Sequence, residues 1–130
     1  MSPRADRILG RRAHGGVLLV PCLINEAYRY WFLADTGAAI TMLSHQAAEE
    51  MGLDVSSPFR QERIASVHQT ALAPVTRLSS LQVGGRRLTD VEAIVLPLPV
   101  DLRVDGLLGV NFLQRFRPTF EFGPSVLVLR

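Results

Sequence analysis

One acidic residue, Asp35, stands between two apolar runs, and this arrangement constrains the chain more than any other feature. Residues 28–34 before it are aromatic or aliphatic except for one arginine, and residues 38–40 after it are again apolar. Asp, Thr and Gly are also ordinary components of a surface Asx turn. However, a carboxylate between buried segments is costly unless it is hydrogen-bonded or has a chemical task. The apolar flanks therefore favour a strand that delivers Asp35 into a tight loop at a functional site.

The two residues that follow Asp35 suit such a loop. Thr36 carries a hydroxyl that can brace the loop through a hydrogen bond. Gly37 can adopt backbone angles that are closed to other residues, and its missing side chain lets a neighbouring chain approach closely. Asp35, Thr36 and Gly37 are therefore candidate site residues on chemical grounds.

The remaining pattern predicts a mostly β domain with two short helices. Pro21 within an apolar run indicates an edge strand or a bulge. Gly84 and Gly85 are the clearest hairpin signal, Ser44 is a good helix N-cap, and Gly52 suits the position after a helix. Strands are expected at residues 17–24, 28–34 (buried on both faces), 78–83, 86–96 and 107–108, helices at 46–51 and 110–116, a turn at 105–106, and further hairpins with tips near 68–70 and 123–124.

The chain has 130 residues, enough for a single domain. Residues 1–16 are polar, basic and glycine-bearing and are expected to be flexible, which leaves residues 17–130 as the folded domain. All 14 basic residues are arginines, and the formal net charge is only +2. Four of these arginines lie in the first twelve residues and the others are dispersed. No stacking aromatic residues accompany Arg86 and Arg87, so nucleic-acid binding is not expected.

Several other classes of protein are disfavoured. Cys22 is the only cysteine, so an intrachain disulfide is impossible. No apolar run reaches the ~20 residues of a membrane-spanning helix. The three histidines are too scattered for a zinc site, and no Gly-x-Ser-x-Gly motif of a serine hydrolase occurs. Without a visible secretory signal the expected location leans to the cytoplasm, although an anchor upstream of Met1 is compatible with the sequence.

A second segment supports the first one. The residues Leu107, Leu108 and Gly109 precede the second expected helix, and alone they would be ordinary core. Together with the segment Ala34-Asp35-Thr36-Gly37-Ala38, in this order and at this separation, they resemble the retropepsin family, the retroviral-type aspartic proteases and their cellular and bacterial relatives. The resemblance covers roughly residues 17–130, and the form Asp-Gly-Leu-Leu-Gly is most similar to that of the bacterial members.

This resemblance implies a retropepsin-like acid protease fold, a closed or partly open barrel-like half, and a defined set of site residues. Asp35 is the implied general acid and base, with Thr36 and Gly37 supporting its loop. The triplet 107–109 is the implied structural support beneath that loop. Residues 64–75 fall where the family has its flap, a hairpin that folds over bound peptide. The implied substrate contacts are Gly37, Ala38, Val67, His68, Gln69 and Thr70.

Hydrolysis by this chemistry needs two carboxylates that face one water molecule and share a proton. Only Asp35 is followed by the Thr-Gly or Ser-Gly of such a loop, so the second carboxylate must come from another copy across a two-fold axis. The implied protein is a homodimeric aspartic endopeptidase that acts on peptides without a metal or cofactor. Two departures matter: Ala39 stands where the family usually has a polar residue, and the flap tip lacks glycines. A catalytically weak dimerisation or peptide-binding module of the same fold is therefore the alternative.

Overall fold

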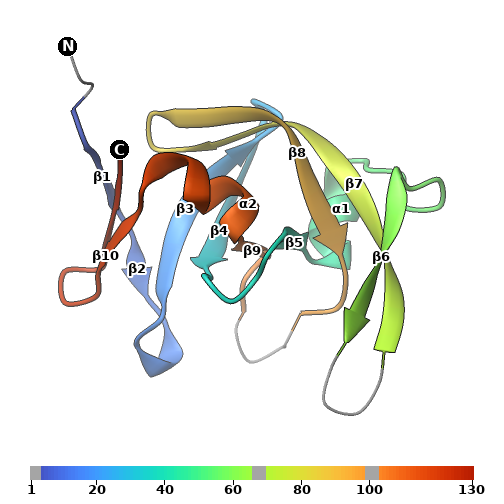
Figure 1. Cartoon of the computed structure of the whole chain (residues 1–130), viewed down its shortest axis with the longest axis horizontal. Helices are drawn as coiled ribbons and strands as arrows, with labels where there is room; N and C mark the ends of the chain where they lie inside the picture. Colours follow the sequence, from blue (N-terminus) through green and yellow to red (C-terminus); the bar gives the residue numbers. More distant parts are fainter. Residues whose placement is uncertain (1–3, 66–69, 99–102) are drawn as a thin grey trace.

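A computed structural model of the chain describes residues 4–65, 70–98 and 103–130 (Figure 1). It is mostly β-structure with two short α-helices, as predicted. The elements, in chain order, are β1 (Asp6–Leu9), β2 (Arg11–Arg12), the 3-10 turn η1 (His14–Gly16), β3 (Leu18–Ile24), β4 (Tyr28–Ala34), β5 (Thr41–Leu43), α1 (His45–Glu50), β6 (Arg60–Ala65), β7 (Thr70–Val83), β8 (Arg86–Val95), β9 (Gly106–Leu108), α2 (Val110–Leu113), the 3-10 turn η3 (Gln114–Phe116), β10 (Thr119–Glu121) and β11 (Val126–Leu129).

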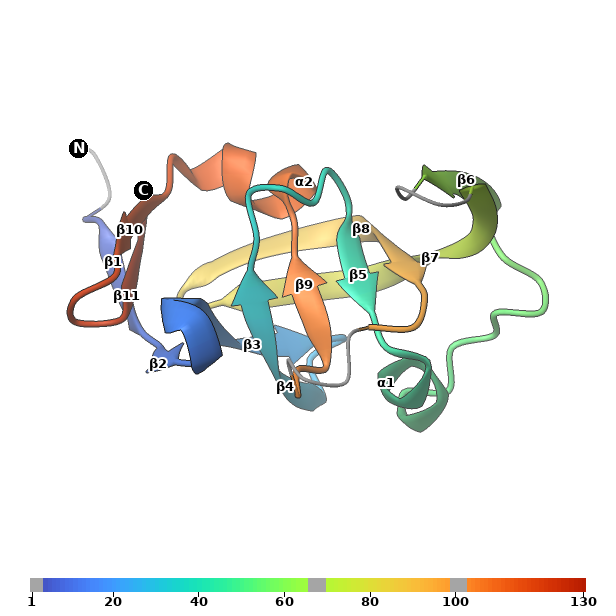
Figure 2. The same cartoon turned by 90° about the horizontal axis from the view of Figure 1, so that it is seen from below.

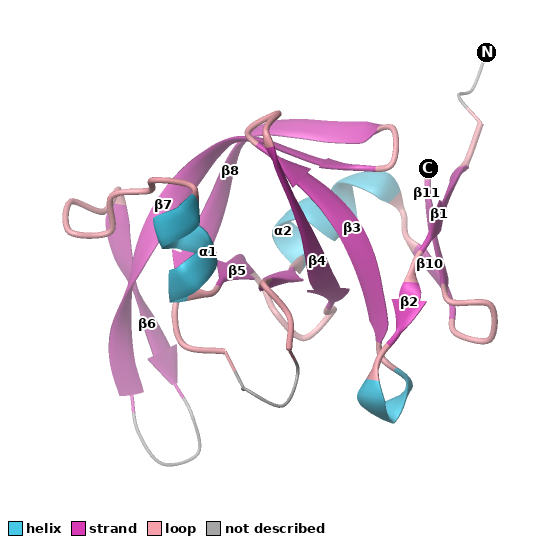
Figure 3. Ribbon diagram, turned by 180° about the vertical axis from the view of Figure 1, so that it is seen from behind, coloured by secondary structure: helices cyan, strands magenta, loops and turns pink. Residues whose placement is uncertain are grey.

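The larger sheet closes on itself. Its strand order is β2-β3-β4-β9-β5-β8-β7-β6, and an additional pairing of β3 with β7 joins six of these strands into a ring. The ring is a small barrel, in which each strand is paired on both sides over at least part of its length. A second, three-stranded sheet has the order β1-β11-β10, so the two ends of the chain lie side by side at one end of the molecule (Figures 1 and 3).

The local signals in the sequence produce the expected turns. Residues 84–85 connect β7 to β8, and Gly84 has a positive φ of 59°. The Ser44 hydroxyl accepts the Ala47 N–H at 3.0 Å and so caps α1, and Gly52 follows that helix with a φ of 70°. The final hairpin joins β10 to β11. These predictions are confirmed. Pro21 lies in β3 at an exposed position between the short stretches that pair with β2 and with β7.

The barrel interior holds the main hydrophobic core, which includes Phe32, Leu43, Leu78, Leu108 and Phe112, each fully buried. A smaller cluster lies on the opposite face of the sheet. Its buried members are Ala73, Val75 and Ile94, and the half-buried side chains packed on them are Ile40, Met42, Ile64 and Leu96. Alternation of side chains along each strand explains the two clusters, because successive residues point to opposite faces.

The prediction of a flexible segment over residues 1–16 is wrong for residues 6–16, and residues 1–3 lie outside the described part. Strand β1 pairs along its length with β11, and β2 pairs with β3. Arg7 donates two hydrogen bonds of 3.0 Å to the carboxylate of Glu121. Asp6 accepts the N–H of Gly85, and Ile8 is buried. Burial and these long-range bonds hold a segment whose composition alone suggested a solvated end.

Two further expectations need correction. Strand β4 is not buried on both faces throughout, because Arg29 is exposed and Trp31 is half-buried. The 105–106 turn does not form as predicted, since Gly106 belongs to β9. A Cβ atom there would lie 2.4 Å from the carbonyl oxygen of Met42 and 2.6 Å from the Phe32 ring, so glycine allows close packing. No helix within the described residues is long and apolar enough to cross a membrane.

Candidate active site

The Asp35 loop begins where β4 leaves the barrel. The Asp35 N–H donates to the carbonyl of Leu108 at 3.0 Å, which continues the pairing of β4 with β9. One carboxylate oxygen, Oδ1, accepts the N–H of Gly37 at 2.8 Å. A Cβ atom on Gly37 would stand 3.1 Å from that oxygen, so the bare glycine leaves room for the carboxylate. Asp35 is half-buried, Thr36 and Gly37 are exposed, and within the described residues no hydrogen bond reaches Oδ2.

The start of α2 supports this loop from below. The N–H groups of Val110 and Asn111 donate to the carbonyls of Ala38 and Ala39, at 2.8 and 3.0 Å. These bonds satisfy helix N–H groups that have no partner within the helix. Gly109 makes the contact possible, because a Cβ atom there would lie 2.7 Å from the Ile40 carbonyl carbon and 2.9 Å from the Ala38 carbonyl oxygen. Gly109 and the Leu108 that precedes it thus lie directly beneath the loop.

Two residues that sequence reasoning missed, Thr41 and Asn111, fasten the loop to the barrel. Thr41 is fully buried; its hydroxyl donates to Asn111 Oδ1 at 2.9 Å and accepts the Gly109 N–H at 3.1 Å. The Thr41 N–H also donates to Asn111 Oδ1, at 2.8 Å, and the amide nitrogen of Asn111 donates to the carbonyl of Glu92. Both residues lie close to the predicted motifs in the sequence. Each is a polar residue within an apolar run, and this was the signal from which their role could have been predicted.

A row of apolar side chains crosses the sheet next to Asp35. Cross-strand pairing places Leu33 beside Leu107, Leu107 beside Met42, Met42 beside Ile94, and Ile94 beside Val75. We call these five residues the apolar row. Leu107 and Met42 are half-buried, whereas Ile94 and Val75 are buried. Because Asp35 follows Leu33 by two residues, its side chain emerges at the side of the sheet on which the row lies. Figure 2 shows β4, β9 and β5 adjacent, with their loops at α2.

The β6–β7 hairpin extends beyond the barrel at the predicted place of the flap. Ile64 pairs with Ala71, and the smaller hydrophobic cluster connects this hairpin to Ile40 and Met42. Thr70 is exposed at the start of β7. The other predicted tip contacts, Val67, His68 and Gln69, lie outside the described residues. Ala38, a predicted substrate contact, is only 4% exposed, whereas its neighbour Ala39 is exposed.

Other titratable groups lie away from this loop. Burial raises the pKa of Asp105, which accepts the Trp31 N–H at 3.4 Å. Burial and a hydrogen bond to Glu50 raise the pKa of Tyr30 to about 12. Burial also raises the pKa of the Cys22 thiol, so this cysteine is a poor nucleophile. His14 and His45 are exposed, and no group of three potential metal ligands occurs within residues 4–65, 70–98 and 103–130.

Comparisons with known proteins agree with this geometry. The chain is similar in fold to a retropepsin-like aspartic protease from Rickettsia conorii, with a TM-score of 0.75, 22% sequence identity, and coverage of 99% of this chain and 96% of that one. A comparison with the curated proteins found no match. The sequence profile of the aspartyl protease family matches residues 20–112, which include the Asp35 loop and the segment beneath it. The chain therefore belongs to the aspartyl protease family.

Proposed function

We propose that the protein is an aspartic endopeptidase whose active site forms between two copies of the chain, each contributing Asp35. The observation that carries this proposal is the state of the Asp35 carboxylate. Oδ1 is fixed by the Gly37 N–H, while Oδ2 has no hydrogen bond among the described residues. A half-exposed carboxylate at the end of a buried strand, aimed by its own loop, is suited to bind a water molecule and a second carboxylate.

In this mechanism the two carboxylates share one proton, because two adjacent negative charges repel each other. The ionised Asp35 takes a proton from the water as its oxygen attacks the scissile carbonyl carbon. The protonated Asp35 donates its proton to the carbonyl oxygen, which gives a neutral tetrahedral diol. One carboxyl group then protonates the amide nitrogen while the other takes a hydroxyl proton from the diol. The C–N bond breaks, and a carboxylic acid and an amine leave.

The chain on its own supplies only one such loop, so a second copy must complete the site. Thr36 and Gly37 are exposed, and the structure records no hydrogen bond for the Thr36 hydroxyl within the described residues. That hydroxyl is therefore placed to bond across a two-fold axis to the loop of the other copy. In such a dimer the two Asp35 side chains, each next to an open glycine, can approach each other around one water molecule.

In this proposal the apolar row and the β6–β7 hairpin surround the bound substrate. A peptide lying over Asp35 would meet Leu107 and Met42 on one side and the β6–β7 hairpin on the other. The exposed Ala39 would face the peptide backbone without a charged or hydroxyl side chain. The resulting environment excludes water, which strengthens the hydrogen bonds made to the reacting atoms.

The experiment that tests this function compares the wild type with Asp35→Asn on denatured casein at mildly acidic pH. Asparagine cannot act as an acid or a base, so cleavage should fall to background while the circular dichroism spectrum stays unchanged. The matched control is Asp90→Asn, an exposed residue of β8 with a φ of 53°, which asparagine also tolerates. Equal cleavage by both variants would refute the proposal. Peptide binding without turnover, in wild type and variant alike, would instead indicate a binding module.

A further inference from the structure

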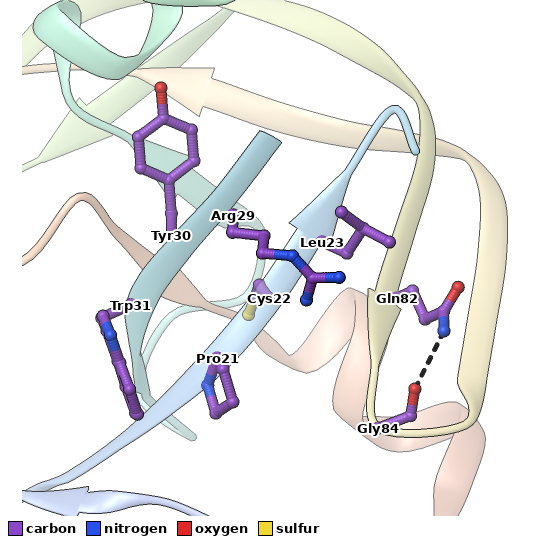
Figure 4. A pocket seen from close by; sticks show the side chains of 8 residues that line it. All are labelled: Pro21, Cys22, Leu23, Arg29, Tyr30, Trp31, Gln82 and Gly84. Carbon is purple, nitrogen blue, oxygen red and sulfur yellow. Dashed lines mark hydrogen bonds between the residues drawn. The ribbon is translucent and has the colours of Figure 1, made fainter. Parts of the chain in front are cut away.

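A cavity borders β4 on the side that pairs with β3, away from β9, and it has no role in the proposed reaction. Its volume is about 420 Å³, and its wall includes Pro21, Leu23, Arg29, Trp31, Gln82 and Gly84 (Figure 4). This size is within the range of sites that bind small ligands. No acidic side chain lines the cavity, whereas Arg29 does.

The cavity lies on a gap in the sheet. Strand β3 pairs with β2 only at Leu18 and Leu19 and with β7 only at Leu23 and Ile24, so the edge between them is open. The Trp31 backbone exchanges its hydrogen bonds with Asp105 on the other side of β4. Because the sides alternate along an antiparallel pair, Pro21, the partner of Trp31, directs its carbonyl into the gap. The open edge thus offers one main-chain acceptor.

The side chains around the gap combine an aromatic ring with positive charge. Pro21, Leu23, Arg29 and Trp31 share one face of the β3–β4 pair, since they are direct cross-strand partners. The guanidinium carbon of Arg11 lies 4.1 Å from the centroid of the Trp31 ring. Arg29 is exposed, and within the described residues it forms no salt bridge or side-chain hydrogen bond. Tryptophan and arginine are the residue types that contribute most often to binding energy at interfaces.

We propose that this cavity is a docking site for an extended acidic peptide segment. A carboxylate side chain would pair with Arg29, an apolar side chain would pack on Trp31 and Pro21, and a peptide N–H would donate to the Pro21 carbonyl. The charge of the lining selects an acidic partner. Continuity with the face that bears Leu33 selects a polypeptide, because Trp31 is four residues, or roughly 13 Å along the strand, from Asp35. The choice of a polypeptide therefore rests in part on the proposed function, whereas the positive charge of the lining and the Pro21 carbonyl in the gap do not involve the chemistry at Asp35.

The chain provides its own probe for this site, because Trp31 is its only tryptophan. The test uses the full-length Asp35→Asn chain, which keeps the peptide intact, and follows tryptophan fluorescence. The ligand is a capped hexapeptide in which two glutamates flank a leucine, and the comparison is the same peptide with glutamines. We expect a saturable change with the acidic peptide, and about tenfold weaker binding of the glutamine peptide, since a charge-assisted hydrogen bond to arginine is lost.

Two variants locate the site. Arg29→Ala should weaken binding of the acidic peptide about tenfold as well. Arg115→Ala, which removes an exposed arginine from η3, should leave it unchanged. Binding should also weaken as salt is raised, because exposed charges are screened. The proposal is overturned if fluorescence does not change, if the two peptides bind equally, or if Arg29→Ala binds as well as its parent. The glutamine peptide requires no variant, so misfolding of Arg29→Ala would not obscure the answer.

Discussion

The Asp35 loop and the β6–β7 hairpin face the same apolar row but are held in different ways. The loop is bonded from below by α2 and β9 and is tied to the barrel by the buried hydroxyl of Thr41. The outer part of the hairpin, from Thr70 to Pro74 in β7, pairs only with β6. Backbone bonds and packing therefore fix the Asp35 loop on several sides, whereas the outer part of the hairpin is held by a single ladder.

The base of the hairpin is held by strand pairing with β8 and, in addition, by contacts between side chains. Arg60 of β6 pairs with Glu92 of β8 at 2.9 Å and also with Glu62, and its partners are about one-third exposed. Arg77 lies over the exposed Phe59 ring, with 3.7 Å between the guanidinium carbon and the ring centroid. Such half-exposed ion pairs contribute little to global stability. Under the proposed function, this contrast would allow the hairpin to admit a peptide while the carboxylate stays in place.

The largest effect, on both stability and cleavage, is expected from Gly109→Ala, which disturbs the packing of α2 against the Asp35 loop. The φ of Gly109 is −92°, so the added methyl group causes no backbone strain of its own. It would, however, meet main-chain atoms of Ile40 and Thr41 at 2.7 Å. Main-chain atoms cannot rotate away, so we expect a loss of about 3 kcal/mol in the free energy of unfolding, measured by urea titration, together with loss of cleavage.

Gly123→Ala is the matched control for this substitution. Gly123 lies in the β10–β11 turn, its φ is not in the left-handed region, and no atom would lie within 4 Å of an added Cβ. Its free energy of unfolding should stay within about 0.5 kcal/mol of the wild type. If Gly109→Ala were as stable as this control, the close support of the loop by α2 would be refuted.

An intermediate effect is expected from Thr41→Val, which keeps the shape but removes the hydroxyl. The Gly109 N–H would lose its acceptor in a buried place, at a cost of about 2 kcal/mol in the free energy of unfolding. Cleavage should fall more than stability alone explains, because the loop would loosen around Asp35. Thr89→Val, on the exposed part of β8, is the control and should change neither quantity. An unchanged Thr41→Val protein would show that the hydroxyl does not hold the loop.

The smallest effect concerns the hairpin and is a dependence on pH. Hydrogen bonding to Arg60 lowers the pKa of Glu92 below its usual value. The ionised pair therefore stabilises the hairpin base fully above the usual pKa of glutamate, and this contribution is lost as the pH falls through the lowered pKa. At acidic pH the rate of amide hydrogen exchange in β6, corrected for the intrinsic exchange rates, should then rise. The corrected rate in β9 should stay the same. In the Glu92→Gln variant, exchange in β6 should already be faster at neutral pH. If this variant exchanged at the wild-type rate at neutral pH, a stabilising Arg60–Glu92 pair would be contradicted.

Local signals made much of the fold predictable. Gly84 and Gly85 specify a hairpin by backbone freedom, Ser44 specifies a helix start by its hydroxyl, and the apolar run before Asp35 specifies a strand. Each of these signals acts within a few residues, so it can be read without knowing the fold. The candidate loop was predictable for the same reason, since its three residues and its apolar flanks are contiguous.

What could not be predicted depends on partners that are distant in the sequence. Strand β1 is held by Glu121 and β11, which lie more than a hundred residues away, so its short charged sequence looked like a free end. Thr41 and Asn111 acquire their role only when the fold brings together two residues that are 70 positions apart in the sequence. Gly106 looked like a turn residue because its close contact with the Phe32 ring, which requires a glycine, cannot be read from the sequence.

Mixing wild-type protein with the Asp35→Asn variant tests most directly whether one active site needs Asp35 from two chains. The measurement is the cleavage rate at a fixed wild-type concentration, after time for subunit exchange, as the variant is added. Mixed dimers would carry a single aspartate and be inactive, so an equal amount of variant should leave about half of the initial rate, and a large excess should abolish it. A rate that stays constant at every ratio would contradict a shared site.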